Sequence, residues 1–277
     1  MQKINYPLIV SDFDGTLVKE DGTISEYTKK TIRRYINDGG KFAVSTGRMP
    51  AGILPRIHEL GLSGLVCCGQ GTAIVEIDTN EVLLHGRMPN DVAVTVCEKM
   101  ESLGLHIHVY DLWDYYSNMD DEALKLYESI VKTKGIVVAD KPISQFVKES
   151  GLCPYKVLAM VEEKDNERFR LELEKENFEN CTVTRSSKFL IEVGSASYSK
   201  GTAVEFLANR FQIPLEKTIA IGDQYNDLPM IKKAGLGIAV KNADDALRSV
   251  ATVANYTNEE DAVAKIIEKY AYGEEEK

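Results

Sequence analysis

Residues 7–16 read Pro-Leu-Ile-Val-Ser-Asp-Phe-Asp-Gly-Thr, and this stretch decides the fold. Its first half is a short apolar run without polar alternation, which is typical of a parallel strand buried on both faces. Its second half is an acidic loop in which Gly15 allows the chain to turn sharply. A buried strand that ends in a polar loop predicts an α/β fold with functional side chains at the strand end.

The same pattern of a strand ending in a polar loop returns at residues 41–48 and again at residues 218–223. Helical spacing between these segments predicts helices over residues 25–38 and 200–210, with Ser25 as the N-cap of the first. Strands that alternate with helices predict a doubly wound parallel sheet. Because ligands bind at the carboxyl ends of the strands in such sheets, we expect the polar loops to form one site.

A different pattern occupies the middle of the chain, where two helical stretches alternate with three candidate strands: 91–103 and 163–177 for the helices, and 107–110, 155–161 and 181–185 for the strands. This predicts a separate α+β domain inserted into the first one. We therefore expect a doubly wound core of residues 1–85 and 189–277 with an inserted α+β domain of residues 86–188. A further strand predicted over 190–193 falls in the core.

Composition excludes several classes of protein. The chain has 277 residues, of which 44% are hydrophobic and 27% are charged, as in an ordinary globular protein. Its formal charge of −10 would repel a phosphate backbone, which argues against nucleic-acid binding. No apolar run approaches the roughly 20 residues that span a bilayer, and no apolar signal segment begins the chain. We expect a cytoplasmic protein that binds neither nucleic acid nor membrane, with its five scattered cysteines as free thiols.

The three polar loops carry side chains suited to phosphate and metal chemistry. Asp12 and Asp14 directly follow the first strand, Ser-Thr-Gly-Arg follows the second at 45–48, and Gly-Asp-Gln-Tyr-Asn-Asp lies at 222–227. Taken singly, the first two loops also fit ordinary turns, and Lys200 fits a solvated lysine at a helix end. Taken together, converging carboxylates require a divalent cation, and oxygen-only ligands favour Mg²⁺. Lys200 would then balance the charge of a bound phosphate.

In combination these motifs resemble the haloacid dehalogenase superfamily. The resemblance rests on Asp-x-Asp-Gly-Thr-Leu at 12–17, Ser-Thr-Gly-Arg at 45–48, Lys200 and Gly-Asp-x-x-Asn-Asp at 222–227, and it covers nearly the whole chain. More narrowly, the chain is similar to Cof-type phosphatases, which carry a large α/β cap between the second and third motifs. The resemblance implies a Mg²⁺-dependent phosphatase. Its expected substrate is a small phosphorylated metabolite, such as a sugar phosphate, a nucleotide or a phosphorylated cofactor.

The same resemblance implies a role for each motif residue. Asp12 is implied as the nucleophile that forms an aspartyl-phosphate, and Asp14 as the general acid and then the base for water. Mg²⁺ is implied to bind the Asp12 carboxylate, the Asp14 backbone carbonyl and Asp223. The remaining implied roles are phosphate binding by Thr46, Gly47, Lys200 and Asn226, and support of Lys200 or the metal by Asp227.

Two alternatives remain beside the phosphatase. Asp14 separates the chain from P-type ATPases, which have Thr at this place, and from true dehalogenases, which lack the second Asp. An Asp here fits hydrolysis of the phosphoenzyme or a phosphosugar mutase. A non-catalytic phospho-ligand-binding protein is disfavoured because every motif residue is present. One departure from the family pattern is Gly69-Gln70-Gly71 after the third strand, where relatives often have Asn-Gly, so the amide is kept on a longer arm.

Substrate choice is expected to lie in the insert, because the core motifs recognise only the phosphoryl group. Aromatic and histidine side chains gather in one short stretch of it: His106, His108, Tyr110, Trp113, Tyr115 and Tyr116. They could stack on a ring or bond a sugar hydroxyl, but packing inside the insert is the favoured interpretation. Two histidines without a third ligand make a poor metal site. Arg185, Ser187 and Lys188 are candidates for contact with a second anionic group.

Overall fold

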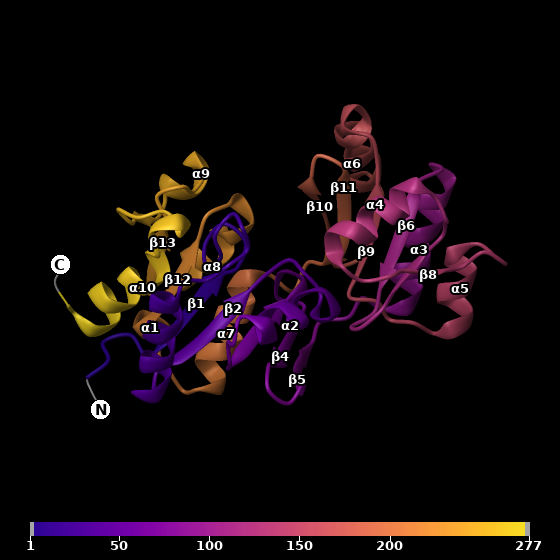
Figure 1. The fold of residues 1–277 in the computed structure, drawn as a ribbon. Coiled ribbons are helices and arrows are strands. Elements are labelled where there is room, and N and C mark those ends of the chain that lie inside the picture. The colour runs from indigo at the N-terminus through magenta and orange to yellow at the C-terminus, as the bar shows by residue number, and fades with distance from the viewer. Residues whose placement is uncertain (1–2, 275–277) are drawn as a thin grey trace. The chain divides into compact units, whose positions relative to one another are not determined.

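The computed structural model describes residues 3–274 and divides into two compact units. Within the described residues, the core unit comprises residues 3–48, 54–84 and 198–274, and the inserted unit comprises residues 49–53 and 85–197. Both ends of the chain build the core unit, where indigo and orange to yellow segments lie side by side in Figure 1. Among the described residues, no helix is long and apolar enough to cross a bilayer.

The core unit is organised around a sheet that, within residues 3–274, has eight strands in the order β14-β13-β12-β1-β2-β3-β4-β5. The strands from β14 to β3 run parallel, and β4 pairs antiparallel with β3. Its strands are β1 (Leu8–Asp12), β2 (Lys41–Ser45), β3 (Leu65–Cys68), β4 (Ala73–Glu76), β5 (Val82–His85), β12 (Thr218–Gly222), β13 (Leu236–Ala239) and β14 (Thr252–Val253). The predicted doubly wound parallel sheet is confirmed.

Strand β1 lies near the middle of this sheet, between β12 and β2, and all five of its residues are buried. The register pairs Ser11 with Ile221 of β12 and Asp12 with Ser45 of β2. Burial on both faces explains why its sequence is a continuous apolar run. As a result, the loops that follow β1, β2 and β12 leave the same edge of the sheet at neighbouring positions.

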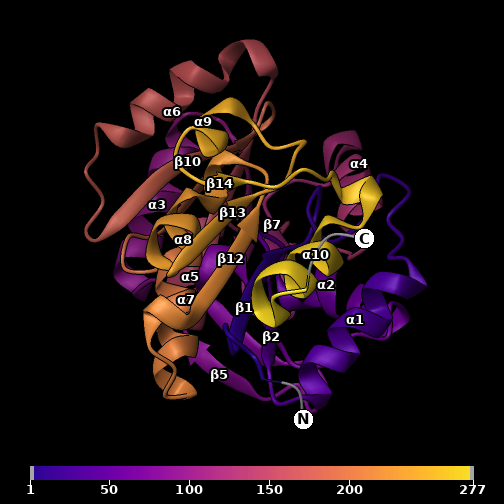
Figure 2. The ribbon, with the colours of Figure 1, turned by 90° about the vertical axis from the view of Figure 1, so that its left-hand side faces the viewer.

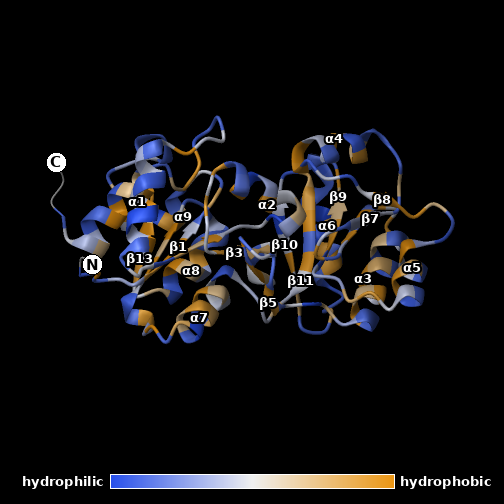
Figure 3. Ribbon diagram, turned by 60° about the horizontal axis from the view of Figure 1, so that its bottom comes forward, coloured by the Kyte–Doolittle hydropathy of each residue, from blue (hydrophilic) through white to orange (hydrophobic). Residues whose placement is uncertain are grey.

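Helices cover both faces of this sheet. Figure 2 shows α1 and α10 on one side and α7 and α8 on the other. The helices of the core unit, including α2, whose first residues are grouped with the insert, are α1 (Glu26–Asn37), α2 (Pro50–Glu59), α7 (Lys200–Arg210), α8 (Leu228–Lys233), α9 (Asp245–Arg248) and α10 (Ala262–Ile266). Two layers of helices around a parallel sheet bury the strand side chains on both faces. Figure 3 shows much of the strand ribbon in orange, the colour of hydrophobic residues.

The local sequence determines where helix α1 begins and ends. The Ser25 hydroxyl accepts a hydrogen bond from the Thr28 N–H at 3.0 Å, which caps the first turn. Ile32 and Tyr35 lie buried against the core, and Gly39 ends the helix with a φ of +100°. The predicted N-cap is confirmed.

The inserted unit contains, among its described residues, a six-stranded sheet in the order β10-β11-β9-β6-β7-β8, antiparallel except between β7 and β8. Side chains of α3, α5 and α6 form a core with one face of it, around Ile107, Val109 and Val157. Its elements are α3 (Asn90–Ser102), β6 (His106–Tyr110), β7 (Tyr115–Ser117), α4 (Glu122–Val131), β8 (Ile136–Val137), α5 (Ile143–Ser150), β9 (Lys156–Met160), α6 (Asn166–Glu174), β10 (Cys181–Ser187) and β11 (Leu190–Ser195).

The second boundary between the units differs from the predicted one at 188/189. Strand β11, predicted to belong to the core, pairs antiparallel with both β10 and β9. Its alternate residues Ile191 and Val193 are buried in the apolar core of the inserted unit. This pairing keeps the chain in the insert until residue 197, and it crosses back at residue 198.

The aromatic stretch of the insert serves mainly as packing. His106, His108 and Tyr110 share one face of β6 with Tyr115, and the rings of Tyr110 and Tyr115 stack with centroids 5.0 Å apart. His108 is fully buried, and this burial lowers its pKa to about 3, so the ring is neutral. Tyr116 packs on the other face against Phe146, and only Trp113 of the stretch is largely exposed, at 42%.

The cap of α1 can be tested by substitution. We expect Ser25→Ala to lower the free energy of unfolding by about 1 kcal/mol, because the Thr28 N–H loses its acceptor. Ser25→Asp keeps an acceptor and is expected to unfold at nearly the same urea concentration as the unsubstituted protein. Equal urea midpoints for Ser25→Ala and Ser25→Asp would contradict the capping role.

Candidate active site

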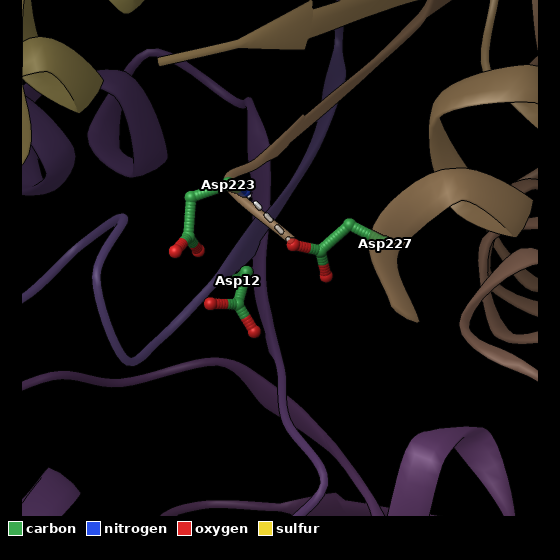
Figure 4. A group of neighbouring side chains, drawn as sticks. All are labelled: Asp12, Asp223 and Asp227. Carbon is green, nitrogen blue, oxygen red and sulfur yellow. Dashed lines mark hydrogen bonds between the residues drawn. The ribbon is translucent and has the colours of Figure 1, made fainter. Parts of the chain in front are cut away.

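Three aspartates converge at the carboxyl edge of the core sheet. Figure 4 shows Asp12, from the end of β1, with Asp223 and Asp227, from the segment after β12, and the three side chains lie close together. One oxygen from each lies within 4.8 Å of the others, and all three residues are buried. The predicted convergence of the first and last loops is therefore present in the structure.

Lys200 joins two of these carboxylates. It is the first residue of α7, its side chain is fully buried, and its Nζ donates to Oδ1 of Asp12 and to Oδ1 of Asp227, the latter at 2.5 Å. The Ser199 hydroxyl accepts from the Thr202 N–H, and the Thr202 hydroxyl accepts from the Ser199 N–H. This capping box fixes the backbone that carries Lys200.

Asp227 serves the site as a support. One of its oxygens binds Lys200, and the other accepts from the N–H groups of Asp223 at 2.9 Å and Gln224 at 3.1 Å. Gly222 makes this possible, since a Cβ there would lie 2.6 Å from the Asp227 side chain. Because both oxygens are engaged, Asp227 orients the lysine and the loop that carries Asp223.

Both carboxylate oxygens of Asp223 face the first loop. Its Oδ1 accepts from the Thr16 hydroxyl at 2.8 Å. A Cβ on Gly15 would lie 2.5 Å from Oδ2, so only glycine leaves room for this carboxylate. Burial, with the nearby charge of Asp227, raises the pKa of Asp223 to about 6.

The charges of the site do not balance by themselves. Burial raises the pKa of Asp12 well above its usual range, against the lowering effect of Lys200, and the charges of Asp227 and Asp223 raise it further. Burial lowers the pKa of Lys200, but the two carboxylates outweigh it and raise that pKa overall, so the ammonium stays charged. Among residues 3–274, the three buried carboxylates thus have one buried ammonium beside them, that of Lys200, which pairs with two of them. This deficit of positive charge in an oxygen-only donor set fits a hard divalent cation.

The second loop is fixed by backbone hydrogen bonds. The N–H of Thr46 donates to the Cys67 carbonyl at 2.8 Å, and the N–H of Arg48 donates to the Thr46 hydroxyl at 3.1 Å. The N–H of Gln70 donates to the Thr46 carbonyl at 3.0 Å. Thr46 is buried and follows Ser45, the register partner of Asp12, so it lies next to the end of β1.

Asp14 lies outside the buried group of carboxylates. Both of its oxygens bind the guanidinium of Arg48, at 2.9 Å each, and both side chains are about half exposed. A bidentate pair of this kind fixes the carboxylate in one orientation. The sequence places Arg48 in a motif, but it does not show that Arg48 pairs with Asp14, because the two residues are 34 positions apart in the chain.

The other predicted residues fall into two groups. Gly47 is half-buried and Asn226 exposed, and both lie at the rim of the buried group in the core unit. Arg185, Ser187 and Lys188 lie in the inserted unit, where the Arg185 Nε donates to the Ser187 carbonyl and Lys188 pairs with Glu163. Sequence reasoning missed Thr16 and Ser199, although one belongs to the first motif and the other precedes the predicted helix.

The comparisons with known proteins identify the family of this chain. The profile of the haloacid dehalogenase-like hydrolases matches residues 9–267, and the chain belongs to this family. A 5-amino-6-(5-phospho-D-ribitylamino)uracil phosphatase of Bacillus subtilis, YitU, is 29% identical over 269 residues, which cover 95% of this chain and 97% of that protein. The phosphatase YwpJ of the same organism is 26% identical over 280 residues, covering 94% and 98% of the two chains.

A solved structure shows the same fold. The crystal structure of a haloacid dehalogenase-like hydrolase from Bacteroides thetaiotaomicron superposes with a TM-score of 0.83 at 28% identity, covering 95% of this chain and 99% of that one. The predicted fold class and family are confirmed. The family and the named relatives make the chain an enzyme, a phosphatase of the haloacid dehalogenase type.

Gly71 offers a test of how the site is held. Its φ is +97°, and a Cβ would lie 2.2 Å from the Ser199 carbonyl oxygen, next to Lys200. We expect Gly71→Ala to cost about 1–3 kcal/mol of unfolding free energy beyond the left-handed alanine itself, and to slow phosphate release roughly 10- to 100-fold by displacing Lys200.

Gly39→Ala is the matched control, since Gly39 has a φ of +100° and nothing within 4 Å of its Cβ position. Gly39→Ala is expected to lose the same roughly 1–2 kcal/mol of unfolding free energy for a left-handed alanine, but its Cβ collides with no other atom. Its phosphatase activity is therefore expected to stay unchanged. Equal losses of stability and activity in the two variants would show that contact with Ser199 has no role.

Proposed function

We propose that this chain hydrolyses the phosphate monoester of a small metabolite in a Mg²⁺-dependent reaction that passes through an aspartyl-phosphate on Asp12. The observation that carries the proposal is the buried group of Asp12, Asp223 and Asp227, in which Lys200 pairs with Asp12 and Asp227. A sugar phosphate, a nucleotide or a phosphorylated cofactor is the expected substrate. The relative that acts on a phosphorylated ribitylaminouracil supports this size and class of substrate.

The donor set supports the proposed magnesium site. Asp12 and Asp223 would hold the ion with their carboxylates, and Asp14 with its backbone carbonyl. Bound there, Mg²⁺ would offset the repulsion between the anionic carboxylate and the anionic phosphate. Asp227 would contribute indirectly, because Lys200 and two backbone N–H groups already occupy its oxygens.

In the first step a carboxylate oxygen of Asp12 attacks phosphorus, the bond to the substrate oxygen breaks, and the alcohol leaves. Lys200 donates to the other carboxylate oxygen, Oδ1, and this hydrogen bond fixes the orientation in which Asp12 attacks phosphorus. We expect the phosphoryl oxygens to be held by Thr46, Gly47, Lys200 and Asn226. Asp14 protonates the leaving oxygen and then takes a proton from the water that attacks phosphorus, which releases phosphate and restores Asp12.

The pair between Asp14 and Arg48 sets a condition on this chemistry. Both oxygens of Asp14 bind Arg48, so the pair must open before Asp14 can exchange a proton with the leaving group. The exposed position of both side chains makes this opening inexpensive, since surface ion pairs contribute only about 0–1 kcal/mol.

The function can be tested by measuring phosphate release from p-nitrophenyl phosphate and a panel of phosphorylated metabolites. We expect release that requires Mg²⁺, stops with a chelator, and falls roughly 10³-fold or more in Asp12→Asn. Asp78→Asn, in the exposed turn between β4 and β5, is the matched control and is expected to keep full activity.

Activity that survives in Asp12→Asn would contradict the proposed nucleophile. A phosphoryl group moved within a phosphosugar without release of phosphate would instead favour a mutase. Metal-independent binding of phosphorylated compounds without any turnover would favour the binding protein.

The role of Asp14 is tested by the choice of leaving group. p-Nitrophenolate departs without a proton, so we expect Asp14→Asn to keep the initial burst of p-nitrophenol while steady turnover falls, because the second step lacks its base. For an alkyl phosphate both steps are expected to fail, with a loss of about 10²–10⁴-fold. Rapid-quench kinetics on the two substrates measures both effects, and an equal loss in the p-nitrophenol burst and in alkyl phosphate turnover would contradict the acid role.

A further inference from the structure

Gln70 has an unusual backbone for a residue with a side chain. It lies in the 3₁₀ segment Gly69–Gly71 that follows β3, with φ 60° and ψ 27°. The left-handed region costs free energy for a residue other than glycine and is uncommon outside turns that need it. Gly69 and Gly71 on either side also have positive φ, of 56° and 97°, so Gln70 is the residue of this segment whose side chain makes such a backbone costly and needs an explanation.

The Gln70 amide group bridges two of the loops that form the site. Its Oε1 accepts from Nδ2 of Asn226 at 3.4 Å, and its backbone N–H donates to the Thr46 carbonyl at 3.0 Å. Its Nε2 lies over Gly47, where a Cβ would approach within 2.6 Å. Only a glycine at position 47 therefore leaves the Gln70 amide in this place.

The orientation of the amide leaves its donors free. Asn226 donates to the oxygen, which turns the NH₂ group toward Gly47. Among residues 3–274, no acceptor is bonded to that NH₂ group. Two N–H donors without a partner, beside a loop of hydroxyl and backbone donors, suit an anionic oxygen.

We propose that Gln70 is a further phosphate-binding residue, whose Nε2 donates a hydrogen bond to an oxygen of the phosphoryl group beside Gly47. The inference rests on the proposed function, because it takes the loop of Thr46 and Gly47 as the phosphate site. Asn226 then has a second task, since it sets the direction of the Gln70 donors. The longer arm of Gln, compared with Asn, carries the amide across to Gly47.

The test is calorimetric titration of the full-length protein with inorganic phosphate in the presence of Mg²⁺. Gln70→Glu keeps the size of the side chain and the oxygen that accepts from Asn226, but it replaces the NH₂ donors with an anionic oxygen. We expect the Kd for phosphate to rise roughly 10- to 100-fold, as for the loss of a hydrogen bond to a charged group.

Two further variants separate binding from structure. Gln212→Glu makes the same charge change at an exposed glutamine with a φ of +56°, in the turn before β12, away from the carboxyl edge, and its Kd is expected to stay unchanged. Gln70→Gly relieves the left-handed backbone, so its melting temperature should be equal or higher while its phosphate affinity falls.

Unchanged phosphate affinity in a folded Gln70→Glu, or in Gln70→Gly, would overturn the inference. A lower melting temperature of Gln70→Gly together with unchanged affinity would assign Gln70 a purely structural role. No phosphate binding by the unsubstituted protein would overturn the proposed phosphate site, and this inference with it. Binding by the unsubstituted protein that Gln70→Glu retains would remove only the role of Gln70.

Discussion

The chain of ion pairs from Asp12 through Lys200 to Asp227 is the interaction on which the site depends. It joins residues 188 positions apart in the sequence and ties β1, the start of α7 and the loop after β12 together. A fully buried lysine is tolerable only with its partners, because removing one partner of a buried pair costs about 3–5 kcal/mol. The chain leaves the core unit after residue 84 and returns at residue 198, two residues before this lysine.

The second constraint is the close approach of polar groups to the backbone at three glycines, which links the packing of the core unit to the geometry of the active site. Gly15 leaves room for Asp223, Gly222 for Asp227, and Gly71 for the backbone before Lys200. Each glycine lies where a polar group approaches closer than a Cβ allows. The same loops therefore bring the carboxylates together and leave them short of positive charge, which is the condition that favours a bound divalent cation.

Much of this arrangement follows from the sequence, because strands buried on both faces and their polar loops leave a local signal. The strand before Asp12, the cap at Ser25 and the meeting of the first and last loops could all be predicted in this way. The assignment of β11 to the inserted unit could not, since a strand pattern does not name its pairing partner. The pair of Asp14 with Arg48 and the bridge from Gln70 to Asn226 were also beyond prediction, because both depend on side-chain directions set by distant loops.

The central claim is that the buried carboxylate of Asp12 becomes phosphorylated. The most direct measurement is borohydride trapping during turnover of a phosphate ester with Mg²⁺, followed by peptide mass spectrometry. An aspartyl-phosphate is reduced to homoserine, so the account predicts homoserine at position 12 and at no other aspartate. Turnover without homoserine at position 12, or with the modification at Asp14 or Asp223 instead, would contradict it.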